Sequence, residues 1–241
     1  MEVTKKIISA ILFCLLVCCS EQTDINLKRF NLEDDVFALG KELMSVNDGL
    51  YLLEEQSKNQ STLLIGVHGR ASRGYEWIYP LKTMDDKETL TSFYRWNDNG
   101  CPMPSYQLLK SSIESMLQLN PNLKKVVVVG HSYGAMLTSL FSSDWANEVP
   151  VTLHLIAGPL AGISLVNSLC AYETPSVINK NVGFYEWRTI KELDGAFKDL
   201  DFDPQVINLP GSNVRRLPEN YKGRKLGHNW SISWVADEIS N

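Results

Sequence analysis

Three residues in this chain have the chemistry of a nucleophile, a base and an acid. Ser132 lies in a Gly-x-Ser-x-Gly box that spans residues 130–134, Asp194 belongs to an acidic segment, and His228 lies near the C-terminus. A serine hydroxyl becomes a strong nucleophile when a histidine takes its proton and a carboxylate orients that histidine. The residue types therefore indicate nucleophilic acyl transfer by Ser132.

The residues around Ser132 indicate how it would be positioned. Four consecutive valines, residues 126–129, precede the box and are typical of a strand that is buried on both faces. Residues 135–141 supply good helix formers with an apolar face. A strand, a tight turn and a helix therefore meet at Ser132, with small flanking residues that avoid clashes on strained backbone. His131 lies inside this turn, where its side chain cannot serve Ser132, and we interpret it as structural.

More than one residue could be the acid, because a run of carboxylates follows the predicted strand at residues 182–190. We prefer Asp194, which lies closely behind that strand and precedes a turn glycine, and keep Glu192 and Asp199 as alternatives. His154 falls within a predicted strand and is interpreted as a core or edge residue.

A His68-Gly69 pair closes another predicted strand, at residues 62–67. Glycine at that point lets backbone N–H groups face a pocket, although the same pair also occurs in ordinary turns.

The remaining pattern predicts an α/β fold with a mostly parallel central sheet and helices on both faces. Ser105 is predicted to cap the helix at residues 106–119. Strands are expected at residues 50–53, 62–67, 89–96, 126–129, 149–157, 182–190 and 206–209, and helices at 35–44, 75–81, 106–119 and 230–239.

These motifs, in this order, resemble the α/β-hydrolase family over about residues 48–241. The resemblance implies Ser132 as nucleophile, His228 as general base and Asp194 as the orienting acid. It also implies an oxyanion hole formed by the backbone N–H groups of Tyr133 and Arg70. A compact esterase or lipase with no cofactor is the expected activity.

Two other classes remain open: an acyltransferase or thioesterase on the same fold, and a non-catalytic binding protein on a hydrolase scaffold. Malonyl-type acyltransferases share Gly-His-Ser-x-Gly but normally carry Glu after the second glycine, where this chain has Ala135. A binding protein usually has a broken triad, and here each member is present. Aromatic residues that include Trp77 and Trp96 either line an acyl pocket or belong to the core.

Composition predicts a single globular domain at residues 21–241, because 44% of the 241 residues are hydrophobic. The net charge of −5 gives no support to nucleic-acid binding. No spacing typical of a metal site occurs. The substrate is expected to be a small-molecule or lipid ester.

Residues 1–20 have the pattern of a secretory signal: two lysines, a short apolar run and a polar end. Residues 16–20 also resemble a bacterial lipobox with Cys19 as the lipidated residue, so we expect an exported protein, either soluble or anchored to a membrane. Cys101 and Cys170 remain in the folded part, and whether they pair is left open.

Overall fold

A computed structural model describes residues 25–240, so the predicted signal segment and Cys19 lie outside the described residues. Seven strands of this region form one sheet in the order β1-β3-β2-β4-β5-β6-β7, in which β1 is antiparallel to β3 and the other pairs are parallel. The prediction of a mostly parallel sheet is confirmed. The strands are β1 (Gly49–Leu52), β2 (Thr62–Val67), β3 (Thr89–Arg95), β4 (Lys125–His131), β5 (Val151–Ile156), β6 (Val182–Arg188) and β7 (Asn213–Arg216).

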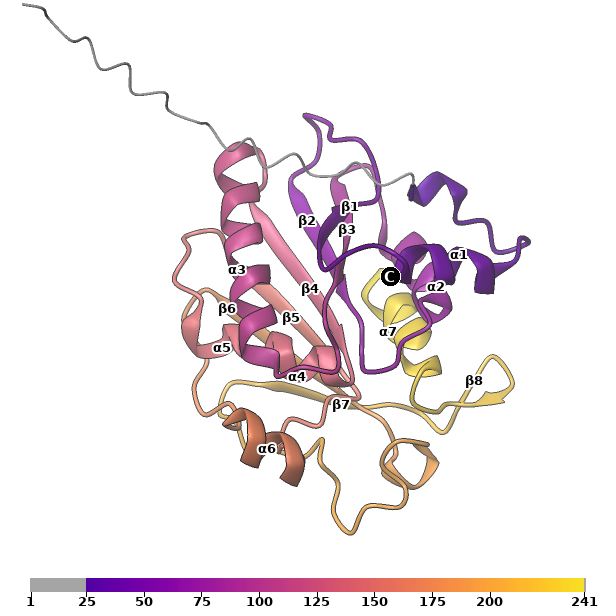
Figure 1. Cartoon of the computed structure of the whole chain (residues 1–241), viewed down its shortest axis with the longest axis vertical. Coiled ribbons are helices and arrows are strands. Elements are labelled where there is room, and N and C mark those ends of the chain that lie inside the picture. The colour runs from indigo at the N-terminus through magenta and orange to yellow at the C-terminus, as the bar shows by residue number, and fades with distance from the viewer. Residues whose placement is uncertain (1–24, 241) are drawn as a thin grey trace, which may run out of the picture.

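Helices cover both faces of the sheet, with α3 on one face and α1, α2 and α7 on the other (Figure 1). A separate hairpin, β8 (Asn220–Tyr221) and β9 (Arg224–Lys225), precedes the last helix. The helices are η1 (Leu27–Arg29), α1 (Val36–Met44), α2 (Tyr75–Met84), α3 (Pro102–Leu119), α4 (Tyr133–Ser139), α5 (Phe141–Asp144), α6 (Ser164–Cys170), η2 (Lys191–Leu193) and α7 (Trp230–Ser240). None of those in residues 25–240 has the length and hydropathy needed to cross a bilayer.

The valine run shows why β4 lies at the centre of the sheet. Val126 and Val128 pack in the core beneath α3, whereas Val127 and Val129 pack in the core beneath α1, α2 and α7. Because successive side chains of a strand point to opposite faces, only a strand that is covered on both sides can bury all four.

One predicted strand is absent, and one predicted helix begins earlier than expected. Residues 206–209 form no strand, and β7 lies instead at Asn213–Arg216, where no strand was predicted. All four residues of β7 are exposed because it is an edge strand, so its polar composition gives no burial signal. The helix expected to be capped by Ser105 begins at Pro102, because proline is well suited to the first helical position.

A disulfide joins Cys101, which caps α3, to Cys170 at the end of α6. Their Cα atoms lie 5.3 Å apart and the cysteines are separated by 69 residues. Closing a loop of that length removes chain entropy from the unfolded state and contributes about 4 kcal/mol in the loop-entropy account. The pairing that the sequence left open is therefore present, and it ties α6 to the segment that follows β3.

A pair of carboxyl groups gives this fold a pH-dependent stability. Thr91 donates its N–H to Glu54 (2.7 Å) and its hydroxyl to Asp85 (2.6 Å), so one residue holds both carboxyls. Burial, together with the neighbouring carboxyl, raises the pKa of Glu54 above 4.5, and burial raises that of Asp85 above 3.8. Between the ordinary pKa of each group and its raised value in the folded state, the folded protein binds more protons than the unfolded chain. The stability of the fold therefore falls as pH rises through that range.

We expect Glu54→Gln to stabilise the protein at pH 7, because the amide keeps an acceptor for Thr91 and removes one of two repelling charges. The effect is small for half-exposed groups, about 1 to 2 °C in the midpoint of thermal unfolding. Thermal melts at pH 7 and pH 4 measure it, and the gain should vanish at pH 4. The neighbouring exposed Glu55 provides the matched control, Glu55→Gln. An equal gain for Glu54→Gln at both pH values would contradict the shared carboxyl pair.

Candidate active site

Ser132 occupies a strained turn between β4 and α4. Its backbone angles are φ 54° and ψ −119°, which a residue with a side chain rarely adopts. Such a conformation costs on the order of 1–3 kcal/mol, and the surrounding structure must hold it. The Ser132 N–H donates to the carbonyl of Ile156 at the end of β5 (2.8 Å), and the Ser132 carbonyl accepts from Ala135 N–H (3.0 Å). The hydroxyl is thereby held at the carboxyl edge of the sheet on a partly exposed residue.

The two glycines of the box are required by close packing. A Cβ atom on Gly130 would collide with the Thr138 side chain of α4. A Cβ atom on Gly134 would collide with the carbonyl oxygens of Val67 and His68 at the end of β2. The Gly-x-Ser-x-Gly pattern is therefore explained by how tightly the turn packs between the sheet and α4.

His228 and Asp194 form a directly bonded pair. Nδ1 of His228 lies 2.9 Å from each carboxylate oxygen of Asp194. Asp194 is fully buried, and its carboxylate also accepts from the hydroxyl of Thr189 (2.5 Å) and from the N–H of Ala196 (2.8 Å). Because Nδ1 must carry a proton to donate to the carboxylate, Nε2 of a neutral His228 is left free as an acceptor.

The structure distinguishes Asp194 from the two alternative acids. Glu192 and Asp199 are exposed, whereas Asp194 follows η2 directly and turns inward towards His228. The structure thus brings His228 to the carboxylate that the sequence analysis preferred.

His131 connects the His228 segment to the turn at Ser132. Its Nε2 lies 3.1 Å from the His228 carbonyl oxygen, and the two imidazole rings lie 4.6 Å apart between centroids. Burial and the proximity of His228 hold the pKa of His131 well below 6.5, so it is a neutral donor. Among the described residues no hydrogen bond joins the Ser132 hydroxyl to His228. Such bonds often tighten only when substrate binds.

The two expected oxyanion donors are the N–H of Tyr133, which follows Ser132, and the N–H of Arg70, which follows Gly69. Tyr133 is the first residue of α4, where a backbone N–H has no partner within the helix. Arg70 follows Gly69, and a Cβ atom added to Gly69 would lie only 2.8 Å from Cβ of Ser132. Gly69 therefore packs against the nucleophile, and Arg70, whose side chain is exposed, is the next residue along the chain.

Other residues considered in the sequence lie outside the site. Trp77 and Trp96 are fully buried core residues, which decides their role in favour of packing. His154 is buried and accepts a hydrogen bond from Trp187 Nε1 (3.1 Å), and burial lowers its pKa to about 4. Residues 25–240 contain no cluster of three or more His, Cys, Asp or Glu that could hold a metal ion.

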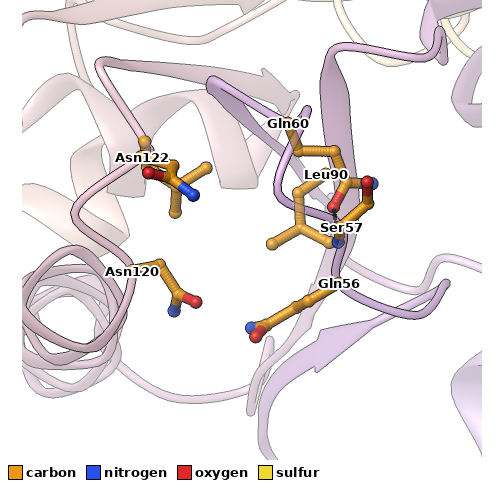
Figure 2. Close-up of a pocket in the computed structure, with 7 residues that line it drawn as sticks. Gln56, Ser57, Gln60, Leu90, Asn120 and Asn122 are labelled. Atoms are coloured by element: carbon orange, nitrogen blue, oxygen red, sulfur yellow. Dashed lines mark hydrogen bonds between the residues drawn. The ribbon is translucent and has the colours of Figure 1, made fainter.

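A small polar pocket lies at the opposite edge of the sheet from Ser132, where β2, β3 and β4 begin. Figure 2 shows the amide side chains of Gln56 and Asn120 pointing into it. Its volume of about 30 Å³ suits one or two water molecules and is too small for an ester substrate.

Two polar residues near the site, Thr189 and Asp98, were not predicted from the sequence, and His68 was noted there only as part of the His68-Gly69 pair. Thr189 bonds to Asp194, His68 bonds to the Gly69 carbonyl, and Asp98 bonds to the N–H of Ala71. Thr189 and Asp98 each follow the carboxyl end of a parallel strand, which is the one sequence signal that would have drawn attention to them.

No protein-family model and no curated protein matches the chain. Among solved structures, Est1E from Butyrivibrio proteoclasticus with bound ferulic acid is similar, with a TM-score of 0.56 and 11% identity, over 80% of this chain and 92% of that one. A second Est1E structure gives a TM-score of 0.51 and 12% identity, over 76% of this chain and 86% of that one. Together with the strand order, these likenesses show that the chain has the α/β-hydrolase fold.

Proposed function

We propose that this protein is a serine hydrolase that cleaves carboxylic esters through an acyl-enzyme. The observation that carries the proposal is the hydrogen-bonded pair of buried Asp194 and half-buried His228, which lies next to the strained turn that presents Ser132. Est1E, whose fold is similar, has been solved with bound ferulic acid, and a carboxylic acid is the kind of product that ester cleavage releases.

The first half of the proposed reaction forms the acyl-enzyme. Ser132 Oγ attacks the ester carbonyl carbon while Nε2 of His228 takes the hydroxyl proton. The ester carbonyl oxygen becomes an oxyanion that accepts hydrogen bonds from the N–H groups of Tyr133 and Arg70. When the C–O bond breaks, His228 returns the proton to the departing alcohol. Asp194 stabilises the imidazolium while it exists and holds Nε2 towards Ser132.

The second half repeats these steps with water. His228 takes a proton from a water molecule that attacks the acyl-enzyme, and the collapse of the second tetrahedral intermediate releases the carboxylic acid and restores Ser132. Chain residues supply each proton transfer, so no cofactor enters the proposed mechanism.

The direct test is hydrolysis of p-nitrophenyl esters of increasing acyl length, combined with labelling by a fluorophosphonate probe. We expect turnover, stoichiometric phosphonylation of Ser132, and an unchanged rate in EDTA. An acyltransferase would instead form more ester than acid in the presence of an added alcohol acceptor, and a binding protein would neither turn over nor react. The chain-length series identifies the acyl group that the enzyme prefers.

We further propose that the protein is exported, and either released or anchored to a membrane through Cys19. The support is the charged start, short apolar run and lipobox-like residues 16–20. Mass spectrometry of the N-terminus from the native host is expected to find either a diacylglyceryl-modified Cys19 or a free Glu21. An intact Met1 would contradict both forms.

A further inference from the structure

The loop after β2 contains a histidine whose protonation state is set by its neighbours. Nδ1 of His68 lies 2.9 Å from the Gly69 carbonyl oxygen, and its Nε2 accepts from the N–H of Trp96 (3.2 Å). Because the first contact requires a proton on Nδ1 and the second requires a lone pair on Nε2, His68 has a single neutral tautomer. Burial is the main cause that lowers its pKa to about 4. His68 is therefore a fixed donor to Gly69.

The hydrogen bond from His68 to the Gly69 carbonyl determines the direction of the Arg70 N–H group. The peptide between Gly69 and Arg70 is trans, so its carbonyl and its N–H point in opposite directions. When His68 holds the Gly69 carbonyl on one side, the Arg70 N–H must face the other. Within residues 25–240 this N–H takes part in no hydrogen bond, which leaves it available to a ligand.

A carboxylate fixes the other end of the same segment. Oδ2 of Asp98 accepts from the N–H of Ala71 (2.5 Å), and Ala71 has φ 54°, a conformation that alanine rarely adopts. Asp98 is 9% exposed and follows the end of β3. Bonds at residues 69 and 71 thus hold the segment on both sides of Arg70. Turning the Gly69–Arg70 peptide would break the first of them and strain the second.

We propose that His68 and Asp98 are positioning residues for the oxyanion hole, holding the Arg70 N–H ready to bind the charged oxygen of the transition state. This inference rests on the proposed ester hydrolase function. A donor that is already oriented costs no reorganisation when the negative charge develops, which is how such donors accelerate acyl transfer. His68 holds the peptide from inside the core, and Asp98 holds it from the neighbouring loop.

The test compares Asp98→Ala, which removes the acceptor, with Asp98→Asn, whose amide oxygen can still accept from the Ala71 N–H. We expect Asp98→Ala to lower kcat about 10- to 100-fold with KM within about twofold, and Asp98→Asn to retain most of kcat. Benzeneboronic acid, which forms a tetrahedral adduct with a serine hydroxyl, should bind Asp98→Ala more weakly by a factor similar to the loss in kcat.

Asp35→Ala is the matched control, because Asp35 also accepts backbone N–H groups but lies at the start of α1. It should lower the thermal midpoint and leave kcat and boronate affinity unchanged. If Asp98→Ala does not fold, Asp98→Ser is measured in the same way, because its shorter side chain keeps a polar group but draws the acceptor oxygen away from the Ala71 N–H.

Failure of the proposed function and failure of the positioning role give different results. If the wild-type protein neither hydrolyses esters nor reacts with the fluorophosphonate probe at Ser132, the proposed function fails. If the wild type is active and folded Asp98→Ala or Asp98→Ser keeps wild-type kcat and boronate affinity, only the positioning role is overturned. An equal loss in Asp98→Asn and Asp98→Ala would also overturn it, since the hydrogen bond to Ala71 would then not be the cause.

Discussion

Replacing Ser132 by alanine is expected to lower kcat for ester hydrolysis by about 10³-fold or more. The substitution removes the atom that forms the acyl-enzyme, while the backbone donors at Tyr133 and Arg70 remain and leave a small residual rate. Alanine keeps the Cβ atom, so the turn and its hydrogen bond from Ser132 N–H to Ile156 are retained. Steady-state kinetics with a p-nitrophenyl ester and loss of fluorophosphonate labelling measure the effect.

Ser139, the last residue of the helix that follows Ser132, provides a matched control. Its buried hydroxyl donates to the Met136 carbonyl (2.7 Å) within α4 and lies in the packed interior. Ser139→Ala removes a hydroxyl of the same kind and should change kcat by less than about twofold, even if it lowers stability by the roughly 1 kcal/mol of a lost hydrogen bond. Full activity of Ser132→Ala would rule out Ser132 as the nucleophile.

The parts of the fold that could be predicted are those in which burial leaves a mark on the sequence. β4 was predicted because a strand covered on both faces needs apolar residues at every position, and residues 126–129 are all valine. The turn at Ser132 was predicted for a related reason, since only glycine fits at Gly130 and Gly134 between the sheet and α4.

The edge strand could not be predicted, because its residues are exposed and polar. β7 pairs with β6 through backbone hydrogen bonds that any sequence can form, so Asn213 and Arg216 gave no pattern. The apolar residues before it resemble a strand in sequence, but Ile207 packs against the core from a loop, without joining the sheet. Apolar character indicates burial, and burial alone does not establish pairing.

The pairing of polar residues was only partly predictable. Asp194 could be chosen because it lies just behind a strand and precedes a glycine, and the structure places it against His228. Asp98 was not predicted, since its partner, the N–H of Ala71, lies 27 residues earlier and any residue other than proline has such a group. Side-chain bonds to the backbone depend on tertiary position, which the residue types do not encode.

Replacing Asp194 by asparagine is expected to lower kcat by about 10³- to 10⁴-fold with little change in KM, because it changes the tautomer of His228. The N–H of Ala196 requires an acceptor at Oδ1 of residue 194, and a backbone N–H cannot reverse its role. The asparagine oxygen should therefore face Ala196, and its NH₂ group should face Thr189 and His228.

An NH₂ group beside Nδ1 of His228 converts that nitrogen from donor to acceptor, so the ring proton moves to Nε2. Nε2 can then no longer take the proton of Ser132, and the imidazolium also loses its neighbouring negative charge.

Glu192→Gln and Asp199→Asn remove exposed carboxylates of the same segment and should each keep kcat within about threefold of wild type. Should Asp194→Asn stay within threefold while one of these neighbours loses its activity, the orienting acid is that neighbour. A His228 ¹⁵N spectrum that shows the Nδ1–H tautomer in wild type and the Nε2–H tautomer in Asp194→Asn would link the kinetic loss to its cause.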